Sequence, residues 1–221
     1  VNEKLTQISV QKDGFLSQIS HELRTPMTSI RSFSEILRDN PEMGDVDKAR
    51  YAGIIHSETL RLTRLLDDLL DLSVLEAGRV SLNLTAKSLS EVIDGALSSA
   101  GVSSGALIEI KRRRANEKIA LFTDVDRLSQ VFINVISNTL KYCDADKRVL
   151  KIKVFEDKEG VSVDFIDNGS AIDREMRDVI FEKFSRVGET KAGGAGLGLA
   201  ICREIMTRLG GQIFYLPGQG G

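Results

Sequence analysis

The feature that most constrains this fold is a long stripe of apolar residues near the N-terminus. Between Leu5 and Leu37, apolar side chains recur at steps of three and four residues. This period places them on one side of a helix, so we predict an amphipathic helix of about forty residues. Asn40, Pro41 and Gly44 then interrupt the pattern and predict a turn.

A second helix is predicted after this turn, because Ile55, Leu62 and Leu69 lie seven residues apart, as in a heptad repeat. Two helices with apolar stripes of this length leave part of each stripe exposed. Pairing with a second copy of the chain covers the stripes in a dimeric four-helix bundle. We therefore expect residues 1–77 to form a dimerisation hairpin and the protein to be a homodimer.

The heptad pattern stops near Gly78, and shorter patterns follow. Alternation typical of strands and spacing typical of helices then succeed each other. We predict strands near residues 80–84, 108–110, 119–121, 150–155 and 161–166, and helices over 89–100 and 126–142. This mixture indicates an α/β sandwich over residues 78–221, with helices covering one sheet.

Composition and charge argue against several other classes of protein. A formal net charge of -2 gives no electrostatic basis for nucleic acid as a partner. No apolar stretch reaches the ~18 to 20 residues that span a bilayer, so we expect no membrane contact by this fragment. Cys143 and Cys202 lack the spacing of a metal site and fit a reducing, cytoplasmic compartment. Because Val1 is not an initiator methionine, we expect a piece of a longer protein, which can carry a membrane anchor elsewhere.

His21 lies in the first predicted helix, away from its apolar stripe. At 100° per residue it is about 200° from Ile19, and same-face neighbours such as Ser17 and Thr28 are polar. A core histidine would point into the stripe, so we interpret His21 as exposed to solvent. A neutral imidazole at such a position has a lone pair that can attack phosphorus.

Two further side chains beside His21 can take part in this chemistry. Glu22 can accept the proton from the other ring nitrogen and stabilise the cation that develops during attack. Because consecutive residues diverge on a helix, a plain solvated carboxylate remains the alternative. Thr25 lies one turn beyond His21, where its hydroxyl can orient water against a phosphate. Pro26 cannot donate to the carbonyl of Glu22, so we expect a kink.

A second group of polar residues lies on the helix predicted over 126–142. Asn134, Asn138 and Tyr142 are four residues apart, with Lys141 beside them, so one face carries two amides, a cation and an aromatic ring. Amide oxygens suit Mg²⁺, which prefers oxygen ligands, and the ammonium group can meet phosphate oxygens. From spacing alone, incidental polarity of the helix is the alternative.

Two glycine-containing segments follow the last predicted strand. Asp167 stands at the strand end, where it can accept a hydrogen bond from the amino group of adenine, and Gly169 permits close approach. A glycine-rich loop later leads into a helix, whose N-terminal N–H groups suit phosphates. The candidate binding residues in this loop are Gly194, Gly196, Leu197 and Gly198. One such loop is weak evidence, whereas three compatible segments in this order indicate a nucleotide site.

The six residues His21-Glu22-Leu23-Arg24-Thr25-Pro26 resemble the H-box of sensor histidine kinases of bacterial two-component systems. The resemblance implies that His21 is phosphorylated, that Glu22 assists, and that Glu22 and Thr25 support dephosphorylation of a response regulator. It also implies a sensor domain upstream, outside this chain. His56 matches no motif, and we assign it to the surface of the second helix.

The later segments resemble the N, G1, F and G2 boxes of the histidine-kinase ATPase domain, of the gyrase/Hsp90 type. By this resemblance, Asn138 holds Mg²⁺, while Asn134 and Lys141 support the phosphates of ATP. Tyr142 then packs near adenine, and Asp167 recognises the base.

Other residues either have a second interpretation or depart from the family pattern. Phe181 and Phe184 resemble the F-box or serve as core anchors, and residues 185–194 would form a lid. Ala171 stands where the second glycine of the G1 box is usual, and Thr139 stands where alanine is often found. If the backbone at Ala171 needs a positive φ, a Cβ there lowers nucleotide affinity.

The leading hypothesis is an autokinase, in which ATP and Mg²⁺ serve to phosphorylate His21. The phosphoryl group then passes to an aspartate of a response regulator receiver domain, toward which we also expect phosphatase activity. One alternative is a degenerate kinase that acts as a dimeric scaffold or mainly as a phosphatase. Another is an ATPase of the gyrase or Hsp90 type with water as the acceptor, which the H-box disfavours.

Overall fold

The computed structural model describes residues 2–78, 81–102, 108–185 and 195–218. Gly194 and nearly all of the predicted lid therefore lie outside the described residues, as does Val80. Among the helices that are described, none combines the length and the apolar character needed to cross a membrane.

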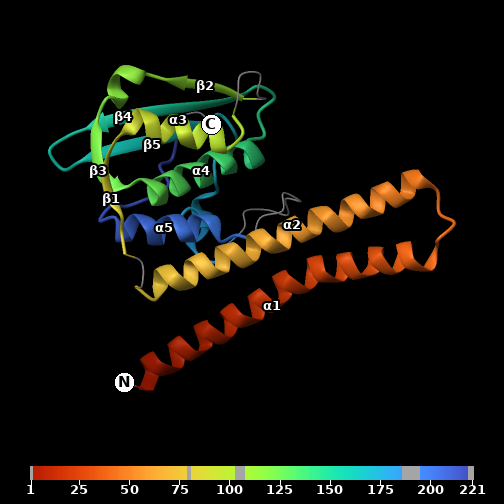
Figure 1. Cartoon of the computed structure of the whole chain (residues 1–221). Helices are drawn as coiled ribbons and strands as arrows, with labels where there is room; N and C mark the ends of the chain where they lie inside the picture. Colours follow the sequence, from red (N-terminus) through yellow and green to blue (C-terminus); the bar gives the residue numbers. More distant parts are fainter. Residues whose placement is uncertain (1, 79–80, 103–107, 186–194, 219–221) are drawn as a thin grey trace.

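Two long helices form the predicted hairpin (Figure 1). The first, α1, spans Asn2–Asp39, and the second, α2, spans Asp45–Glu76. They run antiparallel and side by side, and the rings of Phe33 and Tyr51 stack between them with centroids 5.4 Å apart. The α1 helix continues through Pro26, and its axis changes direction along its length (Figure 1). The prediction of a helical hairpin is confirmed.

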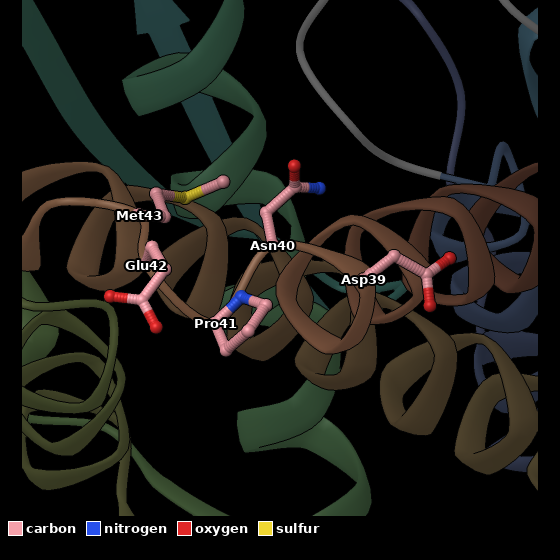
Figure 2. A pocket seen from close by; sticks show the side chains of 5 residues that line it. All are labelled: Asp39, Asn40, Pro41, Glu42 and Met43. Atoms are coloured by element: carbon pink, nitrogen blue, oxygen red, sulfur yellow. The ribbon is translucent and has the colours of Figure 1, made fainter.

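The turn between the helices lies at the end of the hairpin that points away from the α/β domain (Figure 1). Its residues surround a shallow hollow, which Figure 2 shows lined by Asp39, Asn40, Pro41, Glu42 and Met43. The Asn40 side-chain amide donates to the Ile36 carbonyl at 2.9 Å, and the Met43 N–H donates to the Asn40 carbonyl at 3.1 Å. These bonds satisfy carbonyls at the helix end, so the hollow belongs to a tight turn.

The remaining elements combine strands and helices. Strand β1 (Leu84–Ser88) pairs antiparallel with β3 (Ala120–Asp124). Strand β4 (Arg148–Glu156) lies between β2 (Ile108–Arg112), which is parallel to it, and β5 (Val161–Asp167), which is antiparallel. The helices are α3 (Leu89–Ser99), α4 (Val125–Tyr142) and α5 (Gly198–Arg208). Short 3-10 turns are η1 (Arg114–Glu117), η2 (Arg174–Met176) and η3 (Val179–Phe181).

This arrangement confirms an α/β domain after the hairpin, with two differences from the sequence prediction. The strands form two separate hydrogen-bonded sheets within the described ranges, because β1 and β3 pair only with each other. The first strand begins at Leu84 rather than near residue 80. The boundary that we predict between residues 77 and 78 stays a prediction.

One apolar core runs through the α/β domain and into the hairpin. Ile93 of α3, Ile136 of α4 and Leu150 of β4 are fully buried in it. Leu72 and Leu75 of α2 belong to the same cluster, and Figure 1 shows α5 lying between α4 and α2. Burying a side chain of this size stabilises the fold by ~1.5–3 kcal/mol, so α2 is held to the α/β domain by shared apolar packing.

Polar contacts add to this attachment. Asp71 on α2 lies 3.1 Å from the Arg127 guanidinium and accepts a hydrogen bond from the Gln130 amide at 2.7 Å. The Lys183 ammonium lies 2.6 Å from the Glu76 carboxylate. Because Arg127 and Gln130 belong to α4, the hairpin is bonded directly to the helix on which we predict nucleotide-binding residues.

Candidate functional site

His21 lies on the exposed face of α1, as predicted. A hollow of about 290 Å³ opens beside it, lined by Gln18, His21, Glu22 and Phe184. Phe184 comes from the α/β domain, and its ring packs against Phe15 of α1 with centroids 5.6 Å apart. Both domains therefore contribute to the surface next to the histidine.

Glu22 and Thr25 complete the acceptor side of the candidate site. Glu22 is half-buried toward α2, and one carboxylate oxygen lies 3.8 Å from the Arg61 guanidinium. Thr25 is exposed, and its hydroxyl donates to the His21 carbonyl at 3.3 Å. This bond uses the hydroxyl hydrogen, so the Thr25 oxygen can still accept from water. The structure thus brings the three predicted acceptor residues together on one turn of α1.

Asn134 joins α4 to the first turn of α5. Its side-chain amide donates to the Gly198 carbonyl at 3.5 Å, and a Cβ placed on Gly198 would lie 3.8 Å from that amide. Leu197, the residue before α5, is fully buried and makes no side-chain cap among the described residues. A leucine at this position offers no side-chain acceptor to the first N–H groups of α5, so within the described ranges the start of the helix suits an anion.

Both cysteines are free and buried. Burial raises the pKa of the Cys202 thiol to about 12, although a hydrogen bond with Asn134 acts in the opposite direction. The thiol therefore stays protonated near neutral pH and behaves as a small apolar side chain next to Asn134. Cys143 packs at the other end of α4, where its backbone follows the last helical turn.

Thr139 joins α4 to the segment after β5. This buried hydroxyl donates to one Asp167 carboxylate oxygen at 3.4 Å, and the Gly169 N–H donates to the other at 2.9 Å. A Cβ on Gly169 would lie 3.1 Å from the Cys143 Cα and 3.2 Å from Asp167. Thr139 thus orients the predicted base-recognising carboxylate, and Gly169 lets the backbone approach α4 closely.

Asp144 closes the same loop from the other side. Its carboxylate accepts from the Ser170 hydroxyl at 2.5 Å and from the Ser170 N–H at 2.8 Å. The hydroxyl first, and then the N–H, lower the pKa of the Asp144 carboxyl. Ala171, the residue after Ser170, does not have a positive φ, because Phe184 is the only non-glycine residue of the described ranges that does. A Cβ at Ala171 is expected to weaken nucleotide binding only if its φ is positive, and this condition is not met.

Gly196 makes the closest backbone approach in the site. Its φ is +71°, and a Cβ there would lie 2.6 Å from the Ser185 carbonyl oxygen and 2.7 Å from the Phe184 carbonyl carbon. Only glycine fits such a position. Phe184 itself has a φ of 60°, a left-handed conformation that is strained for an aromatic residue. Phe181 is buried, so the core-anchor interpretation holds for it.

The other predicted nucleotide residues lie on the α4 surface. Asn138 is half-buried, Lys141 is exposed, and the Tyr142 ring is 45% exposed. The contacts described above draw together α4, the loop after β5 and the start of α5, which are the three predicted segments. The binding role of each residue stays a prediction, and Gly194 lies outside the described ranges. His56 is exposed on α2, as predicted.

Sequence reasoning missed contacts that join distant segments. The sequence pattern places Phe15 in the apolar stripe. In the structure its ring packs on Phe184, and the Lys183 ammonium lies 4.7 Å from its centroid. Thr139 and Arg61 likewise give no local sign of their partners. No spacing rule connects residues of different elements that meet only when the chain folds, whether within one domain, as for Thr139 and Arg61, or between the two, as for Phe15.

Two known families match separate parts of this chain. Residues 11–78 match the His Kinase A (phospho-acceptor) domain. Residues 123–221 match the Histidine kinase-, DNA gyrase B-, and HSP90-like ATPase family. The first match covers most of the hairpin, and the second covers the α/β domain from the end of β3 onward.

Individual relatives give the same result. Sensor protein kinase WalK of Staphylococcus aureus is 33% identical over 222 residues, which cover 97% of this chain and 53% of that protein. The solved structure of Acinetobacter baumannii histidine kinase AdeS aligns with a TM-score of 0.71 at 25% identity, over 90% of this chain and 92% of that chain. Histidine kinase ThkA, solved in complex with response regulator protein TrrA, has a TM-score of 0.74 at 24% identity, covers 100% of this chain and 62% of that chain, and supports the fold.

A phosphoacceptor-type hairpin followed by an ATP-binding α/β domain defines the catalytic core of a histidine kinase. This chain belongs to the histidine kinase family. It spans about half the length of the curated relative WalK.

Proposed function

We propose that this chain is an ATP-dependent autokinase that phosphorylates His21 and passes the phosphoryl group to an aspartate of a response regulator. The observation that carries this proposal is the hollow beside His21. It is lined by the exposed histidine of α1 and by Phe184 of the ATP-binding domain. A nucleophile and an ATPase-type domain therefore share one surface within a single chain.

On the acceptor side, a ring nitrogen of His21 attacks the γ-phosphorus of ATP. A P–N bond forms, the bond from phosphorus to the bridging oxygen breaks, and ADP leaves with that electron pair. The proton on the other ring nitrogen moves to the Glu22 carboxylate, which removes the positive charge from the imidazole. Thr25 acts in the phosphatase reaction, in which its oxygen orients the water that dephosphorylates the response regulator.

On the donor side, Asp167 would bind the adenine amino group, and Thr139 would hold that carboxylate in place. Asn134 and Lys141 would contact phosphates, near the first N–H groups of α5. The half-buried amide of Asn138 offers an oxygen ligand of the kind that Mg²⁺ prefers. Bound Mg²⁺ would neutralise charge on the phosphates, while the residues of this chain fix the position of the nucleotide. Tyr142, Gly169, Gly196, Leu197 and Gly198 would complete the site.

A second copy of the chain would cover the apolar residues that the hairpin leaves exposed. These side chains are 44–66% exposed, and they are Leu16, Leu60, Leu66 and Leu70. A homodimeric four-helix bundle would bury them and stabilise the association by apolar contact. Light scattering after size exclusion tests this, and a stable monomer at micromolar concentration would contradict it.

A receiver domain is the partner that this function needs, and the fold is shared with a kinase solved in complex with its response regulator. The curated relative WalK is about twice as long as this chain, as expected if a sensor domain lies elsewhere in the full protein. We propose that such a sensor regulates the activity of this core.

Incubation with γ-labelled ATP tests the kinase assignment. Label should enter the wild-type chain in a form that is labile to acid and stable to alkali. The His21→Ala variant should take up no label while it still binds ATP. His56→Ala is the matched control, because His56 is also exposed on the hairpin and should not affect labelling. Undiminished labelling of His21→Ala would refute the assignment.

A further inference from the structure

Arg61 of α2 lies between two carboxylates of the hairpin. Its guanidinium is 3.8 Å from Glu22 on α1 and 3.7 Å from Glu58 on α2. These are ion-pair distances, longer than the ~2.7–2.9 Å of a direct charge-assisted hydrogen bond. One cation is therefore shared between two acids, and one of those acids is the predicted proton acceptor of His21.

The three charges are partly withdrawn from water. Side-chain exposure is 28% for Arg61, 18% for Glu22 and 24% for Glu58. The Glu58 oxygen that faces Arg61 is buried and has no hydrogen-bond partner in the part of the chain that the structure describes. A buried carboxylate oxygen without a hydrogen bond is costly, so electrostatic attraction to the guanidinium is what stabilises it.

The direction of the Glu22 side chain is not set by its place in the sequence. Successive side chains on a helix diverge by about 100°, so Glu22 does not face His21 by default. Glu22 lines the same hollow as His21, while one oxygen of its carboxylate lies 3.8 Å from Arg61 on α2. The cation on α2 therefore influences which rotamer the Glu22 carboxylate occupies.

We propose that Arg61 is a positioning residue, which orients the Glu22 carboxylate for proton transfer from His21. This inference rests on the proposed function. When the proton leaves the His21 ring and binds Glu22, the carboxylate becomes neutral and its attraction to Arg61 is lost. Glu58 remains charged at 3.7 Å and keeps the guanidinium neutralised through the step. The second acid thus lets Glu22 change charge without leaving an unpaired cation between the helices.

The test is the rate of label uptake by the 221-residue chain at saturating ATP. Arg61→Gln should lower this rate about tenfold, the equivalent of ~1.4 kcal/mol, with no change in the KM for ATP. Arg61→Lys keeps the charge and should retain a rate within about threefold of wild type. Arg64→Gln is the matched control, because the Arg64 guanidinium is exposed and bonds only to the Leu60 carbonyl at 3.2 Å among the contacts described.

A double-mutant cycle distinguishes positioning from general damage. If Arg61 acts through Glu22, Arg61→Gln should have little further effect in a Glu22→Gln background. A full tenfold loss in that background, an equal loss in Arg64→Gln, or equal rates for Arg61→Lys and Arg61→Gln would overturn the inference. Equal labelling of wild type and Arg61→Gln contradicts this inference alone. Absence of label on the wild type contradicts the proposed function, and this inference with it.

Discussion

The acceptor and donor ends of this molecule are built in different ways. The acceptor end occupies one turn of α1, where His21, Glu22 and Thr25 follow from helical spacing. The donor end draws together α4, the loop after β5 and the first turn of α5, and its geometry depends on contacts such as Thr139 with Asp167. A substitution at the acceptor end removes a reacting side chain, whereas one at the donor end changes how closely the segments around the nucleotide site pack together.

Among substitutions that change packing at the donor end, Gly196→Ala should cause the largest loss of ATP affinity. Its positive φ and the backbone atoms 2.6–2.7 Å from the new Cβ force the loop to shift. Affinity for an ATP analogue should fall about 100-fold, which corresponds to ~2.7 kcal/mol, as measured by calorimetric titration. Gly95→Ala is the control, since a Cβ there meets nothing within 4 Å. A change under about threefold at Gly196 would refute the idea that fit dominates at the donor end.

Gly169→Ala should have a smaller effect on the same property. The new Cβ would lie 3.1 Å from the Cys143 Cα and 3.2 Å from carboxylate oxygens, so neighbours must move only slightly. We expect ATP affinity to fall about tenfold while the circular dichroism spectrum is unchanged. An effect as large as that of Gly196→Ala would show that the two glycines are equally constrained, contrary to their geometry.

Asp68 on α2 adds a pH dependence where the hairpin meets the donor helix. Burial first, and then the Asp71 charge, raise the pKa of Asp68 to about 6, while Lys141 acts in the opposite direction. The neutral acid is therefore favoured in the fold, and its contribution to stability is complete below pH ~4 and is lost as pH rises through about 6.

Asp68→Asn is neutral at every pH and should remove this dependence. Because the group is partly exposed, we expect it to raise the free energy of unfolding by only about 1 kcal/mol at pH 7.5 and by little at pH 4. Urea unfolding at both values measures this difference. Asp67→Asn, at the exposed neighbouring position, should give a much smaller gain, because the Asp67 charge is only a minor cause of the raised pKa of Asp68. Equal stabilisation at both pH values would contradict the assignment to Asp68.

The smallest effect is expected for Ala171→Gly. Family resemblance suggests that glycine would improve nucleotide binding here, but this backbone is not in the left-handed region. ATP affinity should therefore change by no more than about twofold, in the titration used for the other loop variants. A tenfold gain would favour a weakened donor site and return the degenerate-kinase alternative to consideration.

Features with a local cause could be predicted from the sequence. The period of apolar residues gave both hairpin helices, and the same period showed that His21 points away from the stripe. Alternating residues gave β4 and β5 as neighbouring strands. The candidate site segments were also recognised, because their glycines and amides are close together in sequence.

Features that depend on packing could not be predicted in this way. Periodicity shows which face of an element is buried but not which element covers it, so the separation of β1 and β3 from the larger sheet was missed. The same limit applies to Arg61 with Glu22 and to Phe15 with Phe184. The backbone conformation at Ala171 also depends on packing, because contacts such as Asp144 with Ser170 hold this loop, and its φ is not positive.

The bonds from Asp71 to Arg127 and Gln130 have a thermodynamic consequence for regulation. They join α2 to the helix that carries Asn134 and Asn138, so movement of α2 and occupancy of the nucleotide site share one coupling free energy. Linkage makes this coupling reciprocal. If a displacement of α2 lowers the binding constant for ATP by some factor, bound ATP lowers the equilibrium constant for that displacement by the same factor. If the proposed function holds, the ATP concentration would therefore also affect how readily α2 moves relative to α4.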